Sequence, residues 1–333
     1  MQDIADRAGV TRATVSMALR NHRRIGEATR LRVQGIALHL GYRPNPMISA
    51  LMSNLRMTRS NSQSPSIAVI ISRDWDKWRL SPLALKLDKG ITEQAALLGY
   101  AVEYISLKDL NSNEARLSQI LYARGIQGLI ITSFLSPTDS LDLEWKHFGA
   151  VMLDYSVLDP VLHRVCSHHF HTITLTMKKV LERGYRRIGL AIQRDVNTRI
   201  DRSWEAGFLL FQQSVPAKFR IPPLISPAHN ERGFLKWFHS TTPEVVISDS
   251  LEIFGWMKSL PADSTDFVHL QWTEESGECA GIDPNFDLVG AAAVDALADM
   301  FNRNERGIPL HPKTIMVEGT WKEGRTLRRP LRS

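Results

Sequence analysis

The first twenty residues limit what this chain can fold into, because they contain two short helical patterns separated by a glycine. Gly9 interrupts the first apolar segment, and Thr11 can cap the second helix. Three apolar residues share one face of that second helix: Val15, Ala18 and Leu19. Two short helices joined by such a turn predict a helix-turn-helix, a motif whose second helix enters the major groove of DNA. Spacing alone also allows an ordinary helical hairpin inside a larger helical domain.

The positive charge of the chain lies almost wholly in the same region. The full sequence of 333 residues has a formal net charge of +6. Residues 1–60 contain ten Arg, no Lys and three acidic residues, a net charge of +7, so the rest of the chain carries −1. A basic excess confined to a helix-turn-helix module is typical of phosphate binding, whereas a solvated surface usually mixes both signs.

Residues 3–51 contain several short motifs in a fixed order. They are an Ala-Gly-Val turn, a Thr-Val-Ser helix, a Thr-Arg-x-Arg-Val helix and a Leu-Gly-Tyr-x-Pro-Asn turn, carried by Asp3, Ile4, Ala5, Ala8, Gly9, Val10, Thr11, Thr14, Val15, Ser16, Thr29, Arg30, Arg32, Val33, Leu40, Gly41, Tyr42, Pro44, Asn45 and Leu51. This pattern resembles the headpiece of the LacI/GalR (lac-repressor) family of bacterial transcription regulators. Because so many positions match in register, the resemblance favours the helix-turn-helix over the hairpin.

The resemblance implies a set of DNA-contacting residues. The recognition helix is expected to start near Arg12 and to offer Arg12, Ala13 and Met17 to the bases, while other positions contact phosphates or set the register. The full set is Thr11, Arg12, Ala13, Thr14, Ser16, Met17, Thr29, Tyr42, Asn45 and Leu51. Many family members have Arg at the position of Met17. Since Arg pairs with guanine and Met offers only apolar contact, we expect a different base preference there.

A third helix and a hinge complete the expected N-terminal part. Helical spacing predicts a helix over residues 27–40 that Gly41 ends. Residues 46–56 predict a short helix begun by a proline, too short to be stable alone in water. In the family this hinge helix orders when two subunits pair on DNA and push a Leu, here Leu51, into a minor-groove base step. An ordinary core role for Leu51 is the alternative, and the Ser-rich residues 57–65 are expected to be a linker.

Beyond the linker, the pattern changes to short apolar strands separated by helix-length segments. The strands are expected near residues 67–71, 101–105, 128–131, 150–153, 188–192, 245–247 and 267–270. This α/β alternation predicts doubly wound parallel sheets. A break near residues 158–164 favours two lobes, and the resemblance implies a periplasmic-binding-protein-like effector domain. We expect a headpiece over 1–45, a hinge and linker over 46–65, an effector and dimerisation domain over 66–333, and lobe crossovers near 161–165, 282–288 and 316–319.

The composition argues against a membrane-spanning or exported protein. No run of about eighteen apolar residues occurs, and the N-terminus lacks an apolar signal core, so we expect a cytoplasmic protein without a membrane span. The two cysteines, Cys166 and Cys279, fit a reducing compartment. Because each headpiece would read half of a two-fold site, we expect a homodimer on a pseudo-palindromic operator. No heptad pattern follows Trp321, so we do not expect a coiled-coil tetramer.

Ligands of doubly wound sheets bind beyond the carboxyl ends of the strands, which nominates an effector site in the cleft between the lobes. The candidate residues are Ser72, Trp75, Asp154, His168, His169, Arg202, Trp204, Asp249 and Trp272. Aromatic side chains and carboxylates there would suit a sugar-like small molecule. Each could equally be a half-buried loop residue, and several depart from the family's effector contacts. A regulator without a small-molecule effector therefore stays open.

Residues 163–171 contain four histidines and one cysteine, which raises the question of a metal site. Zinc uses Cys and His in tetrahedral sites, but residues 166–171 alternate too closely for all of these side chains to converge. We therefore expect neutral, hydrogen-bonding histidines at the rim of the cleft, no metal and no cofactor.

Three functions compete. A sequence-specific DNA-binding transcription regulator, in this family usually a repressor, fits residues 1–51. A solute-binding protein of the same fold would have no use for that stretch and would need a signal peptide. An α/β enzyme is not supported, because the sequence contains no nucleophile elbow, P-loop or glycine-rich dinucleotide motif, and we assign no catalytic residue.

Overall fold

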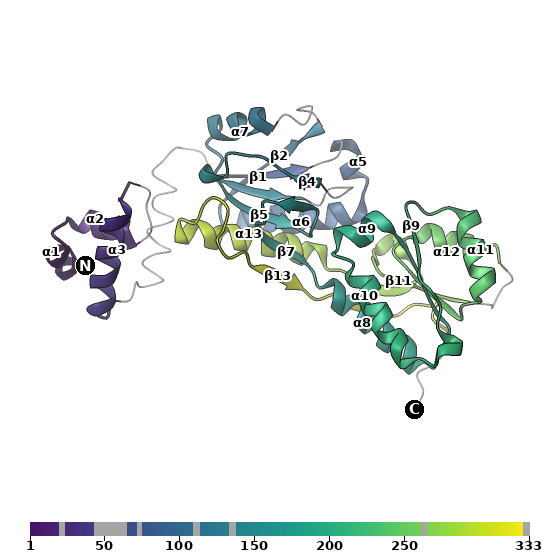
Figure 1. Ribbon diagram of the computed structural model, residues 1–333. Helices are drawn as coiled ribbons and strands as arrows, with labels where there is room; N and C mark the ends of the chain where they lie inside the picture. Colours follow the sequence, from purple (N-terminus) through teal and green to yellow (C-terminus); the bar gives the residue numbers. More distant parts are fainter. Residues whose placement is uncertain are drawn as a thin grey trace.

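The computed structural model describes residues 1–19, 24–42, 65–71, 75–108, 114–132, 138–260 and 265–328. These residues form a small helical headpiece and two α/β lobes (Figure 1). Three residues nominated from the sequence, Asn45, Leu51 and Ser72, lie outside the described ranges, as does the expected hinge helix.

The described residues of the headpiece form three helices: α1 (Gln2–Ala8), α2 (Arg12–Leu19) and α3 (Glu27–His39). Gly9 ends α1 with φ at 63°, a left-handed backbone that costs glycine little. Thr11 caps α2, because its Oγ1 accepts a hydrogen bond of 3.1 Å from the Thr14 N–H. Buried apolar residues from all three helices form one core: Ile4, Ala5, Ala8, Val15, Ala18, Val33 and Ala37. The helix-turn-helix expected from the sequence is confirmed.

The first lobe is a parallel sheet with helices on both faces. Its strand order is β13-β7-β5-β3-β1-β2. The strands are β1 (Ser66–Ile71), β2 (Ala101–Ser106), β3 (Gly128–Ile131), β5 (Gly149–Leu153), β7 (His163–Ser167) and β13 (Thr314–Val317). The helices are α6 (Pro82–Leu97) and α13 (Phe286–Arg303) on one face and α7 (Glu114–Ala123) on the other. Along β1, Val69 packs toward α6 and α13, whereas Ile70 packs toward the α7 side, so both faces of the sheet are buried.

The second lobe repeats this plan with the strand order β14-β12-β11-β10-β8-β9. The strands are β8 (Ile188–Gln193), β9 (Leu224–Ser226), β10 (Val245–Ser248), β11 (Asp266–His269), β12 (Ala280–Asp283) and β14 (Thr320–Lys322). The helices are α8 (His169–Glu182) and α10 (Ser203–Ser214) on one face and α11 (Glu231–Thr241) and α12 (Leu251–Met257) on the other. The pairing is parallel except between β12 and β14. Two doubly wound lobes are therefore present, as expected.

The two lobes also contain shorter elements. They are α5 (Trp75–Arg79), α9 (Arg194–Arg199), the paired strands β4 (Thr138–Ser140) and β6 (Val157–Asp159), and the 3₁₀ turns η2 (Trp145–His147), η3 (Ala217–Phe219) and η4 (Glu274–Ser276).

None of the helices in the described ranges is both long and apolar enough to cross a membrane.

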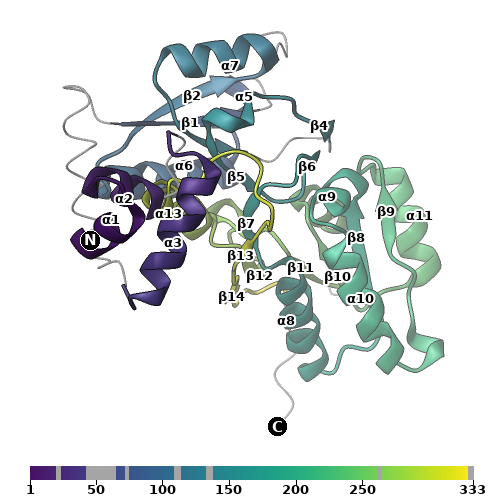
Figure 2. The same cartoon turned by 60° about the vertical axis from the view of Figure 1, so that its left-hand side comes forward.

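The chain passes between the lobes three times, from β7 to α8, from β12 to α13 and from β13 to β14 (Figure 2). The sequence placed the first crossing at residues 161–165, which is wrong, because His163–Ser167 is a strand inside the first sheet and the chain crosses only after it. The strand was missed because it begins with a histidine. His163 is buried there because both ring nitrogens have partners, Nε2 at 2.6 Å from Glu305 Oε1 and Nδ1 accepting from the Lys313 N–H at 3.0 Å.

Candidate nucleic-acid interface and interlobe site

The α2 helix divides its residues between the headpiece core and the surface. Val15 and Ala18 are fully buried, whereas Arg12 and Ala13 are exposed and Met17 is half-buried. The side chains expected to face DNA bases thus stay at least partly accessible outside the core. A short helix anchored on one side and bearing Arg on the other can be inserted into a major groove.

The remaining expected DNA contacts lie around this helix. The hydroxyls of Thr11 and Thr14 are 2.9 Å apart, so Thr11 caps the helix and also stands at its exposed start. Ser16 and Thr29 are half-buried, the latter in the first turn of α3. Tyr42 packs partly against the headpiece core, which leaves part of its side chain accessible.

Asp154 of the first lobe meets His169 of the second. Asp154 follows β5 with φ at 57°, and its Oδ1 accepts a hydrogen bond of 3.0 Å from His169 Nε2. Both side chains are buried. The His169 ring stands edge-on to Trp204, with centroids 5.8 Å apart. Three candidates from the sequence are thus brought together, although Trp204 is 1% exposed and belongs to the core of the second lobe.

Asp249 follows β10 and has its own partners. Its carboxylate accepts hydrogen bonds from His229 Nε2 at 2.9 Å and from the Gln193 N–H at 3.3 Å. His269, the last residue of β11, donates from Nε2 to the Asp249 carbonyl at 3.4 Å and contacts Ser276 Oγ through Nδ1 at 2.9 Å. Burial lowers the pKa of His269 to about 4, so this ring is neutral at neutral pH.

Trp272 lies beside a cluster of charges that joins the lobes. Lys86 of α6 forms ion pairs with Asp283 at 3.0 Å and with Glu274 at 3.3 Å, both in the second lobe. The ammonium groups of Lys86 and Lys322 lie 5.7 and 5.2 Å from the centre of the Trp272 ring. Burial works to lower the pKa of Lys86, but the hydrogen bonds and charges of Asp283 and Glu274 outweigh it, so the pKa is raised and Lys86 stays charged.

The other effector candidates are scattered. Trp75 begins α5, and Arg202 is exposed with φ at 52° immediately before α10. His168 faces Glu318 in the third crossover, whereas its neighbour His169 faces Asp154. The eight nominated residues that the structure describes therefore do not form one site.

Sequence reasoning missed Lys86, His229 and His269. His269 ends a strand that the sequence did predict, and Lys86 lies near the start of the helix between the first two strands. Both positions face the carboxyl edges of the sheets, so the same topological rule could have found them. His229 stands in a loop before α11, where no periodic signal marks it.

The first 45 residues match the family described as bacterial regulatory proteins, lacI family. This N-terminal headpiece is therefore similar to that of LacI-family regulators. It is 28% identical over 192 residues to the transcriptional repressor CytR of Escherichia coli K12, which covers 57% of this chain and 52% of CytR. It is 28% identical over 130 residues to the transcriptional regulator MalR of Streptococcus pneumoniae TIGR4, covering 39% of this chain and 37% of MalR. The chain thus spans about half the length of CytR and less of MalR.

Two solved structures of transcription regulators have the same fold over nearly the whole chain. The lac repressor dimer bound to operator and the anti-inducer ONPF has a TM-score of 0.60 at 18% identity and covers 98% of both chains. The CelR–cellobiose complex has a TM-score of 0.63 at 14% identity and covers 97% of this chain and 98% of CelR. This similarity confirms a headpiece followed by a two-lobed, periplasmic-binding-protein-like domain.

Proposed function

We propose that this chain is a LacI-family, sequence-specific DNA-binding transcriptional regulator, acting as a repressor on a pseudo-palindromic operator. The observation that carries the proposal is the α2 helix, which buries Val15 and Ala18 and leaves Arg12, Ala13 and Met17 for the DNA. Residues 1–60 around it carry a net charge of +7, which suits phosphates. CytR is named a repressor, and the similar lac repressor structure holds operator DNA.

The proposal divides the chain by task. Residues 1–45 read one half-site, residues 46–65 form the hinge and linker, and residues 66–333 bind an effector and pair two copies of the chain. A homodimer follows because each headpiece reads half of a two-fold site. Leu51 is the residue we assign to the central minor-groove step. The protein acts in the cytoplasm, where its DNA lies, and as a regulator it needs no catalytic group.

The test is DNA binding by the full chain. Sequence selection with random duplexes should return one pseudo-palindromic motif, and a mobility-shift assay should show tighter binding to that motif than to a scrambled duplex. Affinity for both should fall as salt rises from 50 to 200 mM, by a factor on the order of a thousand or more if the dimer neutralises about six or more phosphates. Equal affinity for the motif and the scrambled duplex would exclude a sequence-specific regulator.

For the effector we propose a sugar-like small molecule between the lobes. The support is Trp272 with its flanking carboxylates, together with the cellobiose held by CelR. A regulator without a small-molecule effector is the second candidate. It is favoured by the hydrogen bonds that already join Asp154 to His169 and Asp249 to His229, since these carboxylates have fewer free sites for sugar hydroxyls.

Calorimetric titration with cellobiose and with glucose separates the two. Binding that is weakened at least tenfold by Trp272→Ala, but not by Trp256→Ala on α12, would support the sugar-like effector. Trp256 is a matched control because it is a tryptophan of the same lobe that packs against Phe234 of α11. No heat with either sugar favours the second candidate.

A further inference from the structure

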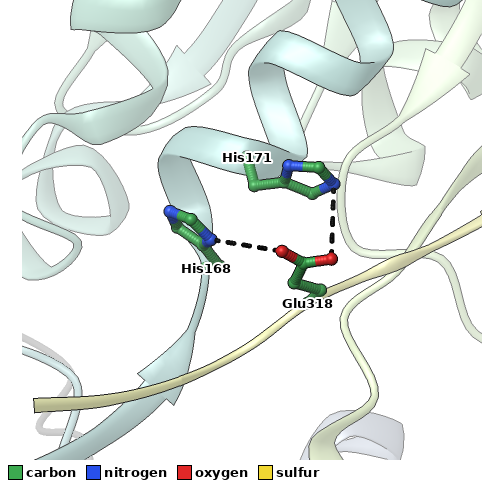
Figure 3. Close-up of side chains that lie close together, drawn as sticks. All are labelled: His168, His171 and Glu318. Atoms are coloured by element: carbon green, nitrogen blue, oxygen red, sulfur yellow. Dashed lines mark ion pairs between the residues drawn. The ribbon is translucent and has the colours of Figure 1, made fainter.

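Three side chains of metal-ligand type converge where the chain crosses between the lobes. His168, His171 and Glu318 bring their donor atoms within 4.8 Å of one another (Figure 3). His168 is the N-cap of α8 and His171 lies in its first turn, whereas Glu318 follows β13 in the third crossover. The sequence disfavoured a metal because the local histidines could not all converge. The third donor comes from a distant segment, which local spacing could not show.

The distances within this cluster are those of separate ligands rather than of a hydrogen-bonded pair. His168 Nδ1 lies 4.0 Å from Glu318 Oε1, and His171 Nε2 lies 3.9 Å from Glu318 Oε2. A direct hydrogen bond between such atoms is about 2.7–3.2 Å long. Ligand atoms at about 2.1 Å from a tetrahedral zinc ion lie about 3.4 Å from each other. The observed gaps therefore need only a small movement of each side chain to admit an ion.

Three other histidine–carboxylate pairs of the two lobes provide the contrast. His163 with Glu305, His169 with Asp154 and His229 with Asp249 are separated by 2.6, 3.0 and 2.9 Å. These three pairs are direct hydrogen bonds. The His168, His171 and Glu318 cluster has the same residue types at a longer spacing.

The backbone around the cluster is fixed. The His168 N–H donates to the Val317 carbonyl at 2.7 Å, and Asn285 Nδ2 donates to the Glu318 carbonyl at 2.8 Å. A Cβ on Gly319 would overlap the Ile282 side chain, so only glycine fits directly after Glu318. These contacts tie all three crossovers together and hold the carboxylate opposite the two rings.

The three side chains are also accessible to solvent and are of types that bind transition metals. His168, His171 and Glu318 side chains are 33%, 35% and 68% exposed, so an ion can enter from solvent. The two rings are stacked, with centroids 5.6 Å apart and planes at 28°. Two imidazoles and one carboxylate suit zinc and related transition metals, whereas Ca²⁺ and Mg²⁺ prefer oxygen ligands.

We propose that His168, His171 and Glu318 bind one divalent transition-metal ion of the zinc type. Three protein ligands leave a fourth tetrahedral position for water. The ion would link α8 of the second lobe to the third crossover and so restrain the region that connects the lobes. The proposal does not depend on the chain binding DNA.

The test is calorimetric titration of zinc chloride into the full chain, prepared without a histidine tag and freed of metal with a chelator. We expect one ion per chain, retained in a millimolar excess of Ca²⁺ or Mg²⁺. His171→Ala and Glu318→Gln should each weaken zinc binding at least tenfold. His239→Ala, which removes an exposed histidine of α11, should leave it unchanged.

Circular dichroism of each variant checks that the fold is kept, as expected for side chains at least a third exposed. If one variant fails to fold, the other still decides the question. The proposal is overturned by a wild-type chain that binds no zinc, or by a folded His171→Ala or Glu318→Gln chain that binds it as tightly as the wild type.

Discussion

Lys86 and Asp283 form a salt bridge of 3.0 Å that joins the two lobes at the place where the chain leaves the second lobe. Asp283 is the last residue of β12, and the next helix, α13, belongs to the first lobe. The two side chains are 19% and 9% exposed, so the pair is largely shielded from water. A charge-assisted hydrogen bond in such surroundings is stronger than an exposed one, so this pair links the lobes beside a crossover.

Replacing Lys86 with Met should therefore destabilise the chain by about 2 kcal/mol, because the buried Asp283 carboxylate loses its shortest partner. Urea unfolding of the full chain measures this. Lys322→Met is the matched control, since Lys322 is 3.7 Å from the same carboxylate but 39% exposed, and its effect should be smaller. A Lys86→Met/Asp283→Asn double mutant cycle with no coupling energy would show that the pair does not stabilise the protein.

The sequence predicted the helices and strands that are marked by a local pattern of apolar residues. The headpiece helices follow from apolar spacing and from the Gly9 turn, and β1 follows from a continuous apolar run that is buried on both faces. The strand β7 was missed because His163 interrupts such a run. Its burial depends on Glu305 and Lys313, which no local pattern connects to it.

The candidate site was harder to predict for the same reason. Asp154 and Asp249 were found because each follows a strand, but their histidine partners are distant in the sequence. His169 reaches Asp154 from the other lobe, and His229 reaches Asp249 from a loop of the same lobe. Lys86 and Asp283 are 197 residues apart, and charged residues carry no periodic signal for such pairing. The partner of each charge could be assigned only in three dimensions.

The buried His269 should make stability depend on pH. Its pKa is lowered from 6.5 to about 4 by burial, so between these values the unfolded chain binds a proton that the folded chain does not. The free energy of unfolding should therefore fall as the pH drops from 6.5 to 4, by about 3 kcal/mol from this residue. Urea unfolding at several pH values should show a shallower fall in His269→Gln, and parallel curves for the two chains would contradict the assignment.

The cap on the recognition helix should contribute measurably to headpiece stability. Thr11→Ala removes the acceptor for the Thr14 N–H and should cost about 1 kcal/mol. Thr11→Ser keeps the oxygen and should stay within a few tenths of a kcal/mol of the wild type. Hydrogen exchange of the α2 amides reports this locally, and equal protection in the Ala and Ser variants would argue against the cap.

Met17 should set the base preference at one position of each half-site. Its half-buried side chain lies on α2 beside the exposed Arg12 and Ala13, and it can offer a thymine methyl only apolar contact. Met17→Arg should introduce a bidentate partner for guanine, worth about 1–3 kcal/mol of discrimination, or roughly tenfold enrichment or more. Parallel sequence selection with both chains measures the change, and Met17→Leu should keep the wild-type motif. Identical motifs from the wild type and Met17→Arg would show that residue 17 does not face a base.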